Sequence, residues 1–539
     1  MKRTVIALAV VLLIGLASAS AAPAPQKIVF ADVVEPISLD PHIGNDNTTT
    51  TAIMMVNDGL LQNLGGKFVP GLAESYTVSP DGAVYTFKLR DAKWSDGVPV
   101  TAQQFVDTYV RMLTREDAMD LAYLIYPIKN ALPLKEKKVD ASKLGVRAVN
   151  ARTLEITLEG PYPFMKALFA SSPMFPIRVD LAEKYGKDYG NSPDKLVSCG
   201  AYLLKEWKHG DRLVFEKNPA YWNAKAIRTP NVEILYISDA NTLKNMYETG
   251  EIHFCVLPAD IIPAMEKKEG FHYYNSGAVT FLCFSNKGTS PDRAKIIQNR
   301  NFMNALSRAI DRADFVKALY PSNVPFTGVV NPSINDQMGG KWSDNYSVAD
   351  KYHKEKANIA EAQAFMKKAC QELGYASADK MPVFEMISTE GELNRTVCEY
   401  FQNVWKKAFG LQVEIKQLAF AQYWDNFYGA PYDIARSGWG PDYDDPFTYL
   451  DMWDSRGGWN KTGWVGESYY KLITEANKQS SMKKRNDMFY QAEAILLQEA
   501  PIIPVMARRG AYMLNEKKIE GVYFNIFAPN LDFRFAKLK

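Results

Sequence analysis

Alternating apolar and polar residues, interrupted by short turns, are typical of the first part of the chain. Alternation with a period of two places one face of a strand in the core and the other in water. A Ser-Pro-Asp-Gly turn at 79–82 joins two such runs, which is the pattern of a β-hairpin. The hairpins predicted in this way cover residues 76–89, 145–158 and 200–216.

Two helices are predicted among these hairpins. Thr101 and Gln104 have the spacing of a capping box, in which each side chain satisfies a free amide of the first turn. This motif predicts a helix that continues through Leu113. The apolar run at 48–61, followed by the glycine pair at 65–66, predicts another helix.

Strands and helices then follow one another along the chain. The first unit of this kind predicts strands at 232–237 and 252–257 around a helix at 242–249. Later strands are predicted at 383–387, 413–417, 432–435 and 502–506, and helices at 392–409 and 482–499. This alternation predicts an α/β fold with mixed or parallel sheets covered by helices. Because no flexible linker separates the segments, we expect the lobes of the fold to share crossing strands.

The N-terminus has the pattern of a secretory signal peptide. Two basic residues precede an apolar run at 5–16, which is too short to anchor the chain in a bilayer. Ala19 and Ala21 form an A-x-A cleavage pattern, so we expect a signal peptide at 1–21. No cysteine precedes Cys199, and the Leu-x-x-Cys signature of a lipid-anchored receptor is therefore missing. These features predict a soluble protein of the bacterial periplasm.

Composition narrows the classes of function. The 63 lysine and arginine residues against 61 acidic residues leave a net charge of +2, far from the basic surface of a nucleic-acid-binding protein. The five cysteines show no C-x-x-C pair, and we expect them to be buried apolar side chains with at most one disulfide. The five histidines are isolated. Neither a metal site nor a cofactor is predicted.

The densest group of candidate binding residues is the segment 433–445, which runs Asp-Ile-Ala-Arg-Ser-Gly-Trp-Gly-Pro-Asp-Tyr-Asp-Asp. It follows a predicted strand, and ligands of α/β proteins sit where strands end. Three clustered acids favour a cationic guest, although a solvated turn would give the same pattern. Because the G-x-S-x-G, H-E-x-x-H and Walker motifs are all missing, no catalytic residue is predicted.

Several motifs together resemble a known family. They are Glu35–His42, Ala92–Thr101, Gly200–Tyr202, Ser307–Arg312 and Arg436–Asp445. In order and spacing they are similar to the periplasmic oligopeptide-binding proteins, which belong to the extracellular solute-binding family 5 of peptide and nickel importers. The resemblance extends over nearly the whole mature chain.

The resemblance implies a two-lobed α/β fold of the large periplasmic binding class, with the ligand cleft between the lobes. The first lobe is then discontinuous, and an extra subdomain is inserted into it. The predicted boundaries are 22–57, 177–277 and 508–539 for the first lobe, 58–176 for the insert and 278–507 for the second lobe.

The resemblance also implies a ligand and partners. Short peptides are expected to bind as an added β-strand between the lobes, through main-chain hydrogen bonds. An inner-membrane ABC permease with its ATPase subunits is the expected partner of a monomeric receptor that is not an enzyme. A receptor of the same fold for an oligosaccharide or a chelated metal remains the alternative.

The binding residues follow from the same resemblance. Asp442 matches the acid that pairs with the α-ammonium of a peptide, and Arg436 matches an arginine that receives a carboxylate. The other matching positions are Trp439, Gly440 and Tyr443 around the acid, Phe281 and Cys283 on a ligand-facing strand, and Asn45 and Asn47 after the first motif.

The chain departs from the family pattern at several of these positions. Cys283 replaces an acid, Phe420 replaces a tryptophan, and Tyr428 belongs to a Phe-Tyr pair that replaces Arg-His. The run after the last predicted strand is changed to Met-Ala-Arg-Arg at 506–509. Preferences for peptide length and side chain therefore cannot be transferred from the family.

Overall fold

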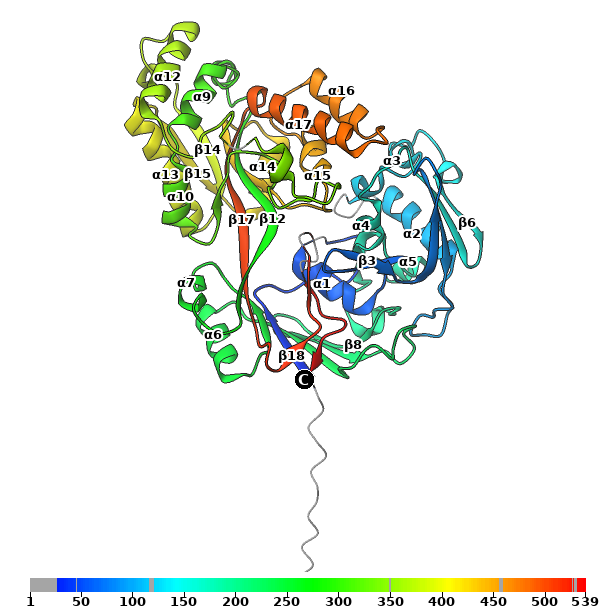
Figure 1. Ribbon diagram of the computed structural model, residues 1–539. Coiled ribbons are helices and arrows are strands. Elements are labelled where there is room, and N and C mark those ends of the chain that lie inside the picture. Colours follow the sequence, from blue (N-terminus) through cyan, green and yellow to red (C-terminus); the bar gives the residue numbers. More distant parts are fainter. Residues whose placement is uncertain are drawn as a thin grey trace, which may run out of the picture.

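A computed structural model describes residues 27–44, 46–115, 121–348, 350–454, 459–525, 527 and 531–539. Two lobes are joined by the long strands β12 (Phe271–Phe284) and β17 (Ile502–Leu514), and a third part lies beside them (Figure 1). The predicted signal peptide lies outside the described residues. Within them, no helix is both long and apolar enough to cross a bilayer.

One mixed sheet runs through both lobes. Its strand order is β15-β14-β16-β12-β17-β11-β1-β10-β9-β8, with β13 paired to β17 beside this path. β12 and β17 pair antiparallel along most of their length, and their register shifts between Asn275 and Val279. The expectation of strands that cross between the lobes is thereby confirmed, since Figure 1 shows both of them running from one lobe to the other.

The first lobe is built around the parallel strands β1 and β10. Its elements are β1 (Lys27–Asp32), α1 (Asn47–Val56), β8 (Tyr202–Lys208), β9 (Arg212–Lys217), β10 (Asn231–Tyr236), α6 (Ala240–Thr249), β11 (Phe254–Val256), α7 (Ile262–Met265), β18 (Ile519–Glu520), β19 (Tyr523–Phe524), β20 (Leu531–Asp532) and β21 (Lys537–Leu538). Apolar side chains on both faces of its sheet form two buried clusters.

The insert has its own antiparallel sheet, in the order β4-β5-β7-β6. Its elements are β2 (Leu61–Leu64), β3 (Lys67–Pro70), β4 (Ala73–Val78), β5 (Val84–Leu89), α2 (Ala102–Thr114), α3 (Ala131–Lys135), β6 (Val146–Asn150), β7 (Thr153–Thr157) and α4 (Met165–Phe169), and α5 (Val179–Tyr185) lies against α2. One apolar cluster fills it, and Tyr443 of the later chain joins that cluster.

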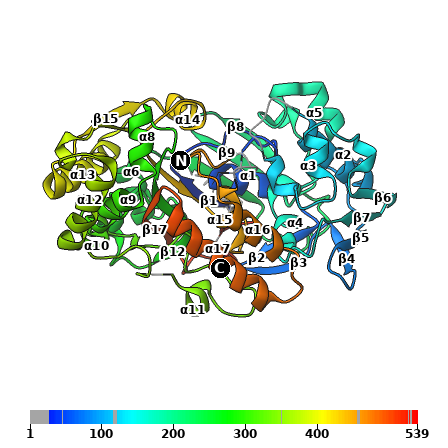
Figure 2. The same cartoon turned by 90° about the horizontal axis from the view of Figure 1, so that it is seen from above.

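The second lobe carries parallel strands, because β14 pairs in parallel with both β15 and β16. Its elements are α8 (Pro291–Ile297), α9 (Arg300–Arg308), α10 (Arg312–Leu319), β13 (Val324–Pro325), α11 (Trp342–Tyr346), α12 (Ile359–Leu373), β14 (Phe384–Thr389), α13 (Glu392–Phe409), β15 (Val413–Leu418), α14 (Phe420–Gly429), β16 (Ile434–Trp439), α15 (Phe447–Leu450), α16 (Glu467–Ala476) and α17 (Met482–Glu499). From above, α15, α16 and α17 lie between α12 and α13 at one end and the insert at the other (Figure 2).

Most predicted elements are confirmed. All three hairpins and the helices α2, α13 and α17 form where they were expected. The helix predicted at 48–61 is wrong beyond Val56, because Asn57 turns to an extended conformation and Asp58 enters a buried polar network. All five cysteines are buried and free of disulfides, as expected. The predicted residue boundaries of the three parts stay a prediction.

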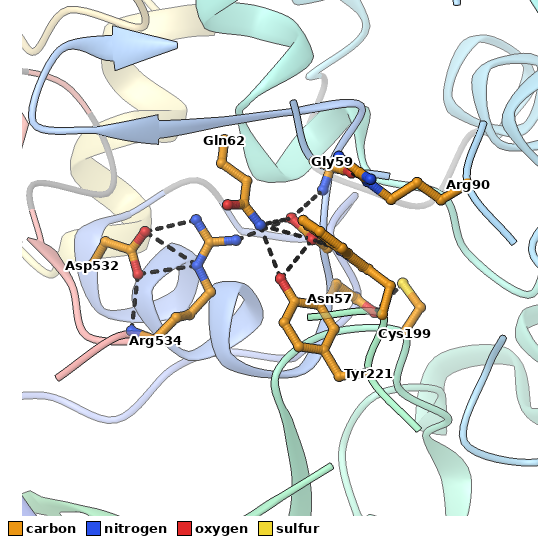
Figure 3. Close-up of polar contacts among 11 residues, drawn as sticks. Asn57, Gly59, Gln62, Arg90, Cys199, Tyr221, Asp532 and Arg534 are labelled. Carbon is orange, nitrogen blue, oxygen red and sulfur yellow. Dashed lines mark hydrogen bonds and ion pairs between the residues drawn. The ribbon is translucent and has the colours of Figure 1, made fainter. Parts of the chain in front are cut away.

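A polar network fixes the point where the chain leaves the first lobe for the insert (Figure 3). The Asp58 carboxylate accepts hydrogen bonds from Gln62 at 2.8 Å, Tyr221 at 2.9 Å and Arg534 at 3.0 Å. Arg534 also pairs with Asp532 at 2.6 Å. Because these residues come from the insert and from distant parts of the first lobe, the network ties the two parts together.

Candidate functional site

The acidic segment lies at the carboxyl end of β16, as its sequence predicts. Between β16 and α15 the loop turns around Thr448, whose hydroxyl oxygen accepts hydrogen bonds from the amide of Asp442 at 3.1 Å and from Trp439 Nε1 at 3.4 Å. Thr448 is fully buried, whereas Asp442 and Trp439 are half-buried and Gly440 is exposed. The buried Thr448 therefore fixes the backbone of the loop on its inner side, while Gly440 lies at the surface.

Two of the three clustered acids are engaged within the second lobe. Asp445 and Arg485 are both fully buried and form a two-point ion pair at 2.8 and 2.9 Å. Asp444 accepts a hydrogen bond from the amide of Asn335 at 2.8 Å and another from its side chain. Such pairing offsets the cost of removing a carboxylate from water. Asp445 and Asp444 thus hold the loop in place.

Asp442 and Tyr443 face the insert. The ring of Tyr443 stacks on Phe164 of the insert, with 4.1 Å between centroids and 9° between planes. Tyr123, also from the insert, has its pKa raised by burial, by the charge of Asp442 and by a hydrogen bond to that carboxylate. Asp442 therefore lies where the second lobe meets the insert.

The surroundings of Asp442 are strongly acidic. Burial and then the charge of Asp442 raise the pKa of Asp451. A cation placed here would lower the electrostatic cost of several neighbouring carboxylates at once. The arrangement therefore suits a positively charged group that is shielded from water.

The two residues expected on a ligand-facing strand are part of a packed core. Phe281 and Cys283 are 1% and 0% exposed and lie in the apolar cluster on one face of the second-lobe sheet. The ring of Phe281 contacts Trp453 at 5.3 Å and Trp459 at 6.1 Å. Burial raises the pKa of the Cys283 thiol. Contact of these two residues with a ligand stays a prediction.

Helix α14 presents an aromatic face to solvent. Phe420 is 71% exposed and Tyr428 is 48% exposed, and Trp424 lies between them on the same face. Tyr428 stacks on Trp424 at 5.7 Å, and burial raises the pKa of the Tyr428 hydroxyl. Contact of Phe420 and Tyr428 with a ligand stays a prediction.

The remaining predicted positions lie elsewhere. Arg436 of β16 donates to the Tyr320 hydroxyl at 2.7 Å and to the Asn394 side chain. Asn47 is exposed at the start of α1 in the first lobe. Asn45 lies outside the described residues. The structure thus brings Asp442, Trp439 and Tyr443 together in the loop that meets the insert, and Asn47 lies at the start of α1 in the first lobe.

Sequence reasoning missed several residues of this boundary. Tyr123 and Asp451 shape the charge around Asp442, and Arg485 holds the loop. They belong to no motif, and Tyr123 is more than 300 positions away in the chain. Arg485 lies within the polar pattern of α17. Its burial there would have indicated an acidic partner, because a buried arginine requires one.

Comparison with known proteins places the sequence in one family. Residues 67–461 match the profile of the bacterial extracellular solute-binding proteins, family 5 Middle. The periplasmic oligopeptide-binding protein OppA of Salmonella typhimurium is 30% identical, over 94% of this chain and 93% of the relative.

Solved structures agree with the sequence match. Listeria monocytogenes OppA bound to peptide superimposes with a TM-score of 0.81 at 27% identity, covering 96% of this chain and 99% of that one. The unliganded open form of the murein tripeptide binding protein MppA gives 0.71 at 25% identity, covering 96% and 98%. The structure therefore has the two-lobed periplasmic binding fold, and the chain belongs to the bacterial extracellular solute-binding proteins of family 5.

Proposed function

We propose that this protein captures short peptides as an extended strand between its lobes and delivers them to an inner-membrane ABC permease with its ATPase subunits. The named relatives are an oligopeptide-binding protein and a peptide-bound structure, which supports this assignment. The family is one of solute receptors, and we infer that this member likewise has no catalytic role.

The position of Asp442 is the observation on which the proposal chiefly depends. Its two acidic neighbours are engaged by Arg485 and Asn335 of the second lobe, and Asp442 itself lies half-buried at the boundary with the insert, where Tyr123 hydrogen bonds to it. A peptide α-ammonium that leaves water requires an anion, and a fixed carboxylate meets that need. Asp442 is therefore our candidate for the N-terminal anchor, with Trp439, Gly440 and Tyr443 around it.

The relative position of the lobes supports a closing mechanism. The chain superimposes better on a peptide-bound relative, at 0.81, than on an unliganded open one, at 0.71. The stacked pair of Tyr443 and Phe164 is a contact that opening between the second lobe and the insert would break. We infer that peptides enter an open form and that closure brings Asp442 to the bound terminus.

We further propose that the protein works in the periplasm as a soluble monomer. The relative from Salmonella typhimurium is a periplasmic protein by name. Cleavage of residues 1–21 would release the mature chain, and the missing lipid-acceptor cysteine favours a form without a lipid anchor.

Calorimetry on Asp442→Ala with free and N-acetylated peptides tests the proposal. Loss of one partner from a buried charge pair costs about 3 to 5 kcal/mol, so we expect affinity to fall more than about a hundredfold. Acetylation should weaken binding to the native protein by a similar factor. It should have little further effect on the variant, because both changes remove the same interaction.

Asp487→Ala is the matched control, since it removes an exposed carboxylate of the same lobe that pairs with Lys483 at 2.8 Å. It should bind free peptides as the native protein does. Equal binding of free and acetylated peptides by the native protein would contradict the anchor role of Asp442. Mass spectrometry of the co-purified ligand would then decide between a peptide and the alternative solutes.

A further inference from the structure

The two strands that join the lobes are not paired regularly along their whole length. Asn275 of β12 lies opposite Arg509 of β17. The next regular pair is Val279 and Ala507, so residues 276–278 of β12 face a single residue of β17. We call residues 276–278 the bulge. Extra residues of this kind bend the strand that contains them.

The bulge separates the part of β12 in the first lobe from the part in the second lobe. On one side of it, β17 also pairs with β11 of the first lobe, through residues 512–514. On the other side, residues 279–284 of β12 pair with β16 of the second lobe. Gly277, at the centre of the bulge, has a φ of 69°, which glycine adopts without strain. The shared sheet is therefore bent where one lobe would turn against the other (Figure 1).

Two buried side chains of the second lobe hold the carbonyl groups of the bulge. The Tyr449 hydroxyl donates to the Gly277 carbonyl at 2.6 Å, and the Asn331 side-chain amide donates to the Ala278 carbonyl at 3.2 Å. Tyr449 is 0% exposed and Asn331 is 2% exposed. Because the bulge stands outside the regular pairing of β12 with β17, these side chains take the place of hydrogen bonds between the strands.

Tyr449 also belongs to the segment that contains the candidate anchor. It lies in α15 next to Thr448, whose hydroxyl oxygen accepts from the amide of Asp442 at 3.1 Å. The amide of Thr448 in turn donates to the carbonyl of Asp445 at 3.2 Å. Since Asp445 is itself fixed by its ion pair with Arg485, α15 and the loop before it form one unit.

The start of the same loop is attached next to the bulge as well. Trp439, the last residue of β16, pairs with Val279, which directly follows the bulge. Its Nε1 also donates to the hydroxyl of Thr448 at 3.4 Å. The two ends of the loop are thus fixed to β12, at Val279 through strand pairing and at Gly277 through the hydroxyl of Tyr449.

The hydroxyl of Tyr449 keeps its proton and remains a donor. Burial, and then the charges of Asp444 and Asp442, raise the pKa of Tyr449 well above its ordinary value. Gly277, whose carbonyl accepts this proton, is buried. Loss of the hydroxyl would leave that carbonyl without its donor, which is costly away from water.

We propose that Tyr449 is a positioning residue that couples the Asp442 loop to the bend of β12, so that pairing of a peptide ammonium with Asp442 favours closure of the lobes. The inference rests on the proposed function and adds the route by which the bound terminus acts on the joining strands. A ligand shifts a conformational equilibrium only through contacts that differ between the two states. The hydrogen bond to Gly277 is such a contact, because closure turns the bulge and changes the direction of its carbonyl groups.

Tyr449→Phe tests the coupling, because it removes the hydroxyl and keeps the ring. Stopped-flow fluorescence would give the association and dissociation rate constants of alanine tripeptide and pentapeptide, each free and N-acetylated. We expect the variant to release free peptides about tenfold faster, since one buried carbonyl loses its donor, and to bind them at a rate within about twofold of native. Release of acetylated peptides should change by less than about twofold. The preference for free peptides should therefore fall about tenfold.

Tyr109→Phe is the matched control. Tyr109 is 0% exposed, and its hydroxyl donates to the carbonyl of Met174 within the insert at 3.1 Å. Urea unfolding should show similar losses of stability for the two variants, because each removes one buried hydrogen bond. Only Tyr449→Phe should change the release of free peptides. A merely structural role of Tyr449 would make the two variants bind alike.

Hydrogen–deuterium exchange on the native protein gives a second measurement that needs no variant. At saturation, free peptide should slow exchange at residues 275–279 more than acetylated peptide does, because only the free terminus pairs with Asp442. Strand β8, at the edge of the same sheet, is the internal reference and should respond equally to both peptides.

The failure of this inference is separate from that of the proposed function. Native release of free peptide by Tyr449→Phe would overturn the coupling, and so would an equal acceleration for free and acetylated peptides. Equal protection of residues 275–279 by both peptides would overturn it even if the variant did not fold. In each of these cases the native protein still binds peptides, and the receptor function stands. If the native protein binds neither peptide, the proposed function fails and the coupling fails with it.

Discussion

Burial acts against the charge of both Arg534 of the first lobe and Arg508 of β17, but their charged neighbours differ. Arg534 is 1% exposed and donates to Asp532 at 2.6 Å and to Asp58 at 3.0 Å. Burial works to lower the pKa of Arg534, but the two carboxylates raise it. For Arg508, burial and Arg436 both lower the pKa.

The difference separates guanidinium groups that carboxylates stabilise from a guanidinium group that has no ion pair among the described residues. A guanidinium removed from water is stable where carboxylates surround it, and in the first lobe they do. The pair of Arg485 and Asp445, both 0% exposed, belongs to this first kind although it lies beneath the candidate site. Arg508 belongs to the second kind, because burial and the charge of Arg436 both lower its pKa.

The largest expected effect follows from breaking the core of the first lobe. Asp58→Ala leaves Arg534 with one carboxylate and removes the acceptor of Tyr221 and Trp222. Such a loss typically costs about 3 to 5 kcal/mol, and urea unfolding followed by circular dichroism would measure it. Glu269→Ala removes a salt bridge to Lys517 whose side chains are both 75% exposed, and should cost at most about 1 kcal/mol. Similar values for both variants would contradict the comparison.

Glu493 is a buried carboxylate whose hydrogen-bond donors are all neutral, so it can be compared with the carboxylates that pair with arginine. Glu493 accepts hydrogen bonds from the amides of Val329 and Val330 and from Trp342, which are neutral donors. Burial raises the pKa of Glu493 from 4.5 to about 7. The folded state therefore binds a proton that the unfolded state releases, so this contribution to stability is complete below pH 4.5 and is lost as the pH rises through 7.

Glu493→Gln isolates this contribution from the other titrating groups. The unfolding free energy of the native protein relative to the variant should decrease by about 3 kcal/mol between pH 4.5 and 7.5, since one pKa unit corresponds to about 1.4 kcal/mol. Urea unfolding at a series of pH values would measure the difference. A difference that does not change with pH would show that the carboxyl keeps its ordinary pKa.

The smallest effect on stability is expected at Arg508 of β17. Arg508→Met should change the unfolding free energy of the empty protein by no more than about 0.5 kcal/mol, because the guanidinium forms no ion pair with any of the described residues. Arg534→Met should cost several times as much, at about 3 kcal/mol or more. Thermal unfolding of the two variants side by side gives the comparison directly. A large loss for Arg508→Met would make Arg508 a structural residue.

Much of the fold could be predicted because its signals are local. The period-two pattern of β4 and β5 and the capping box before α2 specify which face of each element is buried. The helix predicted across residues 57–61 failed, since Asp58 is drawn into contacts with Tyr221 and Arg534. Its environment depends on residues far away in the chain, and helical periodicity contains no information about them.

Some features of the candidate site could likewise be predicted from local sequence, whereas others depend on contacts between distant segments. The sequence alone determined the α/β class, the strand end and the acidic loop that contains Asp442, because backbone direction and residue type are local properties. Only the tertiary structure decided that Asp445 is paired with Arg485 and that Asp442 meets Tyr123. Charges act through space over a few ångströms, and folding sets those distances between segments that the sequence keeps far apart.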